Sequence, residues 1–150
     1  MARLILDRFL PYRLSVASNA VSTQISTAYR RRFGLKIAEW RLIAILAESE
    51  RVTPASLCES GRMDKISVSR AATALIDRGL IKAAANPSDG RSHLLSLTVN
   101  GQKLYAAIAP VALEIEAGLF AGLTATERHT LEELLRRVEG AAAATRNGNS

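Results

Sequence analysis

The spacing of apolar residues differs from that of a helix in only one segment of this chain, and this segment most constrains the fold. Through most of the sequence, apolar residues recur every three or four positions, which is the spacing of helices packed on a core. Residues 80–85 and 92–97 instead form two short apolar runs around the segment Asn-Pro-Ser-Asp-Gly-Arg (86–91). Pro87 presets the backbone for a turn and Gly90 permits a positive φ. The sequence therefore predicts a mainly α-helical protein with one small β-hairpin.

Capping residues and glycines indicate where the expected helices begin and end. Thr53 and Asp64 each precede a helical segment with a side chain that accepts a hydrogen bond from the first turn. Thr124 and Glu127 have the spacing of a capping box. Gly34 follows the first long helix, where a left-handed residue commonly ends one. The expected helices cover about residues 12–33, 37–49, 54–60, 64–78, 99–121 and 125–144.

The short helices at 54–60 and 64–78 are joined by the tight turn Ser60-Gly61-Arg62. This pair resembles a helix-turn-helix, and the hairpin that follows makes it a winged one. A recognition helix presents its N-terminal turns to base edges in the major groove of DNA. The polar face of helix 64–78 carries Lys65, Ser67, Ser69 and Arg70, whereas Ile66, Val68, Ala72, Leu75 and Ile76 are expected to face the core.

The distribution of charge favours a nucleic-acid partner. Residues 1–103 contain 16 Lys and Arg against 8 Asp and Glu, whereas residues 104–150 contain 4 against 6. A basic region attracts phosphate before any specific contact forms. Arg91, in the predicted turn of the hairpin, suits the narrow minor groove, whose negative potential attracts arginine. We therefore expect double-stranded DNA as the partner.

Other classes of protein find little support in the sequence. One cysteine, Cys58, and two histidines exclude a disulfide within the chain and a cysteine-based zinc cluster. No nucleophile–base pair, phosphate loop or metal-ligand spacing is present, so neither an enzyme nor a cofactor is expected. No apolar run is long enough to span a membrane, and charges near the N-terminus interrupt any secretory signal. A reduced, cytoplasmic protein without a membrane partner is expected.

Three segments together resemble the MarR-type regulators. FGLKIAEWRLIAIL (33–46) resembles their second helix, including its Trp-Arg pair. MDKISVSRAATALIDRGLI (63–81) resembles their recognition helix and the Gly-Leu step after it. NPSDGRSHLLSLTVNG (86–101) resembles their wing, with Asp-x-Arg at its tip and Leu-Thr-x-x-Gly opening the next helix. The matches are collinear over about residues 10–140.

This resemblance implies a homodimeric repressor on a pseudo-palindromic operator. It places a winged helix-turn-helix lobe at about 36–98, dimerisation helices at about 1–35 and 99–145, and a frayed tail at 146–150. The long C-terminal helices also contain more apolar residues than one thin lobe can bury, which favours dimerisation. By position, the resemblance assigns major-groove and phosphate contacts to Lys65, Ser67, Ser69 and Arg70, the minor-groove contact to Arg91 with Asp89 orienting it, and weaker phosphate contacts to Thr53 and Ser56.

The resemblance also implies release of DNA by a small aromatic carboxylate or phenol, bound between the first helix and the lobe. Arg13 would pair with a carboxylate and Asn19 would add a neutral polar group. Trp40 would form an aromatic wall, and His93 would reach the pocket from the hairpin. Three of these residues have an ordinary structural interpretation as well, with Trp40 in the core, Arg13 on a dimer surface and His93 as a structural histidine. The alternative is a constitutive or architectural DNA-binding protein without a small-molecule ligand.

Overall fold

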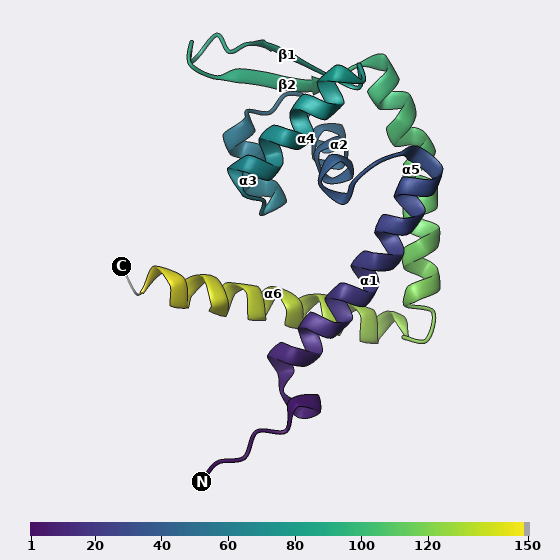
Figure 1. Cartoon of the computed structure of the whole chain (residues 1–150), viewed down its shortest axis with the longest axis vertical. Helices are drawn as coiled ribbons and strands as arrows, with labels where there is room; N and C mark the ends of the chain where they lie inside the picture. The colour runs from purple at the N-terminus through teal and green to yellow at the C-terminus, as the bar shows by residue number, and fades with distance from the viewer. Residues whose placement is uncertain (149–150) are drawn as a thin grey trace. The chain divides into compact units, whose positions relative to one another are not determined.

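The computed structural model describes residues 1–148 and is mainly helical, with one antiparallel hairpin (Figure 1). The predicted fold class is confirmed, and the predicted helices and strands all form close to their expected bounds. The elements are the 3-10 helix η1 (Leu6–Arg8), α1 (Leu10–Phe33), α2 (Ile37–Glu48), α3 (Pro54–Gly61), α4 (Lys65–Asp77), β1 (Ile81–Ala85), β2 (His93–Leu97), α5 (Val99–Leu119) and α6 (Ala125–Asn147).

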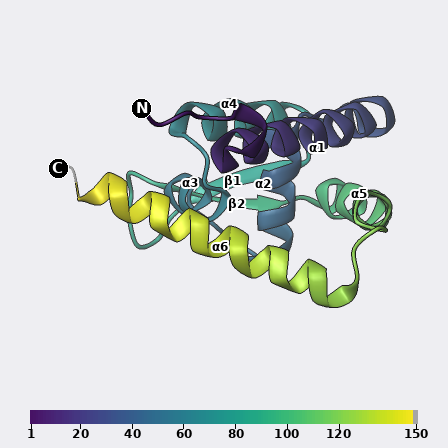
Figure 2. The ribbon, with the colours of Figure 1, turned by 90° about the horizontal axis from the view of Figure 1, so that it is seen from below.

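The hairpin pairs β1 with β2 so that Ile81 lies opposite Leu97 and Ala85 opposite His93. Val52, just before α3, adds an unpredicted bridge, because its N–H and carbonyl both bond to the backbone of Leu95 at 3.0 and 2.8 Å. Figure 2 shows α2 running across the direction of the two strands. The hairpin is thus joined, through the middle of β2, to the segment that precedes α3.

The core side of α4 differs from the sequence prediction. Val68, Ala71 and Leu75 are buried, whereas Ile66 is 63% exposed and Ile76 is 41% exposed. Successive residues of an α-helix are separated by about 100°, so Ile66, two positions before Val68, lies on the opposite face. The prediction that both isoleucines face the core is therefore wrong.

Aromatic rings and one arginine connect α1 to the lobe. The ring of Trp40 in α2 lies edge-on to Tyr29 of α1, with centroids 5.5 Å apart, and stacks on Tyr105 of α5 at 6.0 Å. Gly34 ends α1 in the left-handed conformation, as predicted. Arg78, just after α4, donates hydrogen bonds of 3.2 Å to the carbonyls of Phe33 and Gly34. The end of α1 is thereby joined to the end of α4.

The first turn of α5 packs against the segment between α4 and β1. Thr98 Oγ1 donates to the carbonyl of Gly79 at 2.6 Å and accepts from the N–H of Gly101 at 3.1 Å. Gly101 is buried, and a Cβ atom there would lie 2.0 Å from the carbonyl oxygen of Leu80. Thr98 and Gly101 belong to the Leu-Thr-x-x-Gly segment, so this close approach explains why the segment ends in a glycine.

The chain divides into two compact units, Met1–Ala112 and the part from Leu113 onward. The boundary lies inside α5, two residues after Pro110, which cannot donate a helical hydrogen bond. In the second unit, Thr124 and Glu127 form the predicted capping box. Helix α6 continues through Asn147, so residues 146–147 are helical and not part of a frayed tail; residues 149–150 lie outside the described residues.

Candidate nucleic-acid interface

The N-terminus of the candidate recognition helix α4 is capped by Asp64. One carboxylate oxygen accepts from the N–H of Ser67 at 2.8 Å, and the other accepts from its hydroxyl at 2.7 Å. These two bonds favour the ionised form and hold the pKa of Asp64 below its usual value. The Ser67 hydroxyl, one of the predicted DNA contacts, is therefore engaged in the cap and donates within the protein.

The exposed face of α4 consists of Ile66, Ser69, Arg70 and Thr73. Their spacing of three and four residues places them on one side of the helix. Lys65 is also exposed, at the first position of α4. Neither Lys65 nor Arg70 has an ion pair or hydrogen bond to another side chain within residues 1–148. Two unpaired cations thus flank an exposed face at the start of the helix.

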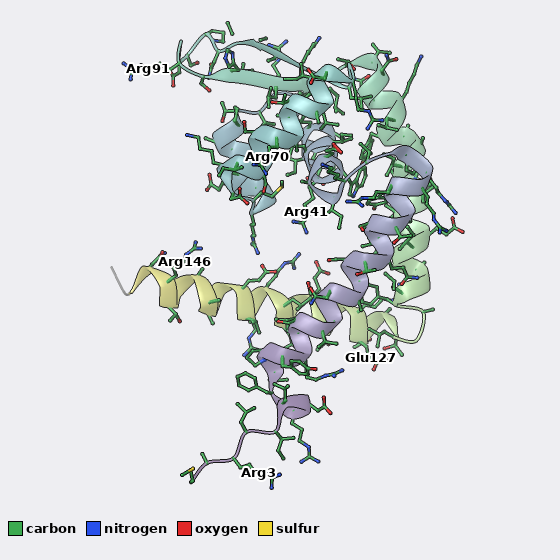
Figure 3. The ribbon with its side chains drawn as sticks, viewed as in Figure 1. Arg3, Arg41, Arg70, Arg91, Glu127 and Arg146 are labelled. Atoms are coloured by element: carbon green, nitrogen blue, oxygen red, sulfur yellow. The ribbon has the colours of Figure 1, made fainter. Side chains whose placement is uncertain are left out.

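The turn of the hairpin is built by two side chains that bond to the backbone. Asn86 Oδ1 accepts from the N–H of Ser88, and Asp89 Oδ1 accepts from the N–H of Arg91, each at 3.0 Å. Asp89 thus orients the backbone of Arg91, while the guanidinium is exposed (Figure 3). Gly90 does not use the positive φ that a glycine permits at this position. The Asn86 and Asp89 side chains stabilise the turn instead.

The two predicted phosphate contacts on α3 have a structural role. Thr53 Oγ1 accepts from the N–H of Ser56 at 3.1 Å and so caps α3, as predicted. Both residues are only partly exposed. The Thr53 hydroxyl retains its proton for donation, and the assignment of both residues to phosphate stays a prediction.

The predicted ligand residues are not joined to one another by any hydrogen bond or ring contact within residues 1–148. Arg13 and Asn19 are exposed on α1, and His93 is exposed at the start of β2. Trp40 is half-buried between Tyr29 and Tyr105, which agrees with its structural interpretation. The ligand assignment of these four residues stays a prediction.

A cavity of about 620 Å³ lies elsewhere in the first unit, between the end of α2, the hairpin and the start of α5. Its lining includes the cations Arg51 and Lys82, the carboxylate Glu50, and Tyr105, whose ring stacks on Trp40. None of the four predicted ligand residues lines it. Among residues 1–148, no cluster of His, Cys, Asp and Glu could hold a metal ion, and no helix is long and apolar enough to cross a membrane.

Sequence reasoning misses two residues at these sites. Ile66 belongs to the exposed face of α4, and its offset from the buried Val68 and Leu75 would have indicated it. No sequence signal identifies Arg78 as the link to α1, because the residues it joins are more than 40 positions apart.

A short helix pair followed by a hairpin, with unpaired cations on its second helix, defines a winged helix-turn-helix DNA-binding protein. The MarR family model matches residues 33–92. A regulator of Bacillus subtilis, the uncharacterized HTH-type transcriptional regulator YdcH, is 30% identical over 127 residues, which cover 75% of this chain and 86% of the relative. The chain therefore belongs to the MarR family of transcriptional regulators.

Two solved structures show the same fold. A MarR/EmrR family transcriptional regulator from Acinetobacter sp. ADP1 has a TM-score of 0.86 at 26% identity, covering 94% of this chain and 99% of that one. A mutant MarR from E. coli, complexed with operator DNA, has a TM-score of 0.79 at 24% identity, covering 91% of this chain and 99% of that one. The chain is thus similar to these regulators over nearly its whole length.

Proposed function

We propose that this protein is a homodimeric repressor that binds a pseudo-palindromic operator and releases it when a small aromatic carboxylate or phenol binds. The observation that carries the proposal is the exposed face of α4, with Ser69 and Arg70 beside the unpaired Lys65. In a helix-turn-helix, this part of the second helix enters the major groove. The proposal includes no catalytic step and assumes a cytoplasmic protein.

The charge and position of each side chain indicate which part of the DNA it would contact. Lys65 and Arg70 neutralise phosphates or read guanine, and the Ser69 hydroxyl bonds to a base or a phosphate. Arg91 extends from the wing, where Asp89 holds its backbone, toward the minor groove. The E. coli relative complexed with operator DNA has the same fold, which supports this placement.

Exposed apolar side chains support the homodimer. On α6, Leu131, Leu134, Leu135 and Val138 are 37% to 53% exposed, at helical spacing. Stable homodimer interfaces are large and apolar, so a second copy of this chain is the simplest partner that would bury such a face. Two copies of α4 related by a two-fold axis would read two related half-sites.

The first test is selection of duplexes from a random-sequence library, followed by affinity measurements over a range of salt concentrations. Each neutralised phosphate releases counterions, so the affinity should fall steeply as salt rises. Enrichment of a two-fold symmetric site supports the proposal. No enriched sequence, or an affinity that does not change with salt, would contradict it.

The effector is tested in two steps. A panel of aromatic acids is first screened for a change in operator affinity, with an expected coupling of about 1–3 kcal/mol. Binding of the active compound is then measured by calorimetry without DNA for wild type, Arg13→Ala and Lys82→Ala. Loss of binding in Arg13→Ala supports the site on α1, and loss in Lys82→Ala supports the cavity beside the hairpin. If no compound changes the affinity more than about twofold, the constitutive DNA-binding protein is the better description.

A further inference from the structure

Ile66 is the most exposed of the large apolar side chains on α4, with 63% of its surface accessible. It occupies the second position of the helix and shares a face with Ser69, Arg70 and Thr73. The core does not need this residue, because Val68, Ala71 and Leu75 provide the buried face. An isoleucine held in water at the tip of a polar, cationic face has no structural explanation within the lobe.

The major groove offers an apolar side chain one kind of partner. Most groups displayed there are hydrogen-bond donors or acceptors, whereas thymine presents its C5-methyl group. Isoleucine cannot form hydrogen bonds, so it would leave a donor or acceptor of another base edge unpaired. Burying a methyl group against its side chain is instead favourable.

The neighbouring residues define how Ile66 would be placed. Lys65 and Arg70, at the adjacent position and one turn along, are unpaired cations suited to the phosphates that border the groove. The Ser67 hydroxyl already donates to Asp64, which leaves Ile66 and Ser69 as the side chains on the exposed face nearest the helix start. Cations at both sides and an apolar group between them match a base edge flanked by phosphates.

We propose that Ile66 reads a thymine by contact with its C5-methyl group and so contributes to operator specificity. The inference rests on the proposed DNA-binding function and adds a specificity residue that the pattern of polar side chains does not reveal. The contact is apolar, so it should contribute to discrimination between bases without changing the dependence of affinity on salt.

The test replaces each thymine of the selected duplex, one at a time, by uracil, which differs only in lacking this methyl group. For the wild-type protein, replacing one particular thymine in each half-site should lower the affinity for the duplex about fourfold. This is the effect of removing one buried methyl group. For Ile66→Ala, the same replacement should cost less than about 1.5-fold, because the partner of the methyl group is gone. The salt dependence of Ile66→Ala should equal that of wild type.

Ile76→Ala is the matched control, since Ile76 is also an exposed isoleucine on α4 but lies about 15 Å further along the helix. It should retain the wild-type preference for thymine over uracil. The inference is overturned if no thymine methyl matters to the wild-type protein, or if Ile66→Ala keeps the full preference. A wild-type protein that enriches no duplex would instead contradict the proposed function itself, and this inference with it.

Discussion

The helix-turn-helix lobe and helix α6 use apolar residues in opposite ways. In the lobe, Leu42, Leu57 and Leu75 are completely buried, and the helices and hairpin close a core of their own. On α6, no residue is buried, and its leucines remain more than a third exposed. The same residue type thus stabilises a fold in one region and provides a surface in the other. The lobe buries these leucines within one chain, whereas α6 leaves its leucines exposed, as the proposed dimer requires.

The charges follow the same division. The unpaired cations Lys65, Arg70 and Arg91 lie in the first unit, whereas on α6 Arg136 forms an ion pair with Glu132, and His129 Nε2 lies 3.4 Å from a carboxylate oxygen of Glu133. Exposed ion pairs within one helix contribute little to stability. These contacts pair part of the polar face of α6 within the helix, whereas its leucine face is exposed.

Removing α6 should have the largest effect. A chain that ends after residue 123 should lose the dimer completely, because the exposed leucine face is removed with the helix. A chain that ends after residue 147 retains this face and should remain dimeric. The masses of both are measured at micromolar concentration by sedimentation. A dimer in the shorter chain would show that α6 is not the interface.

The stability of the lobe should be most sensitive to substitution where the backbone of α5 approaches the backbone just before β1. Gly101→Ala places a Cβ atom 2.0 Å from the carbonyl oxygen of Leu80, so the start of α5 or the chain before β1 must shift. Forced displacement of a packed core costs about 1–3 kcal/mol in the free energy of unfolding. Gly118→Ala, in the same helix with no atom within 4 Å of the added Cβ, should be neutral or stabilising by up to about 1 kcal/mol. Chemical denaturation of both variants checks this, and equal stabilities would refute the close approach.

The cations should differ in how they affect DNA affinity. Arg70→Ala should weaken all duplexes similarly and reduce the salt slope by about one phosphate contact per subunit. Arg91→Ala should reduce the preference for A·T-rich flanks, because the narrow minor groove attracts arginine. Arg146→Ala, an exposed arginine in the last turn of α6, should change neither quantity. If Arg91→Ala weakens A·T- and G·C-flanked operators equally, the wing contacts phosphate alone.

The helix caps should give a small dependence of stability on pH. Hydrogen bonds from Ser67 lower the pKa of Asp64 below 3.8, and those from Thr124 lower the pKa of Glu127 below 4.5. Stability from these carboxylates is present above their ordinary pKa values and is lost as the pH falls through the lowered ones. Asp64→Asn keeps a capping side chain without the titration, so its unfolding midpoint should fall less between pH 5 and about pH 3. An unchanged pH profile would contradict the role of the Asp64 carboxylate.

Features that depend on neighbouring residues are the ones the sequence predicts well. Gly34 ends α1, and Thr53, Asp64 and Thr124 cap the helices expected of them. These signals act within one turn of the chain, so they can be recognised from short patterns. The hairpin is predicted within one residue at each strand for the same reason.

Contacts between distant residues are not predictable in this way. The bridge from Val52 to Leu95 and the bonds from Arg78 to the end of α1 depend on how the elements pack. Ile66, on the exposed face of α4, is a different case, because its offset from Val68 and Leu75 along the helix could have been recognised in the sequence. Its hydrophobicity suggests the core, but the core-facing side of α4 is set by packing against α2 and α3, which leaves Ile66 in solvent.

The central claim is that two copies of the lobe, joined through the terminal helices, read DNA together. The most direct test is a hydroxyl-radical footprint of the full chain on the selected duplex, combined with the mass of the complex. We predict two protected half-sites about one helical turn apart, centre to centre, with two protein chains bound. A single protected half-site with one bound chain would contradict the account.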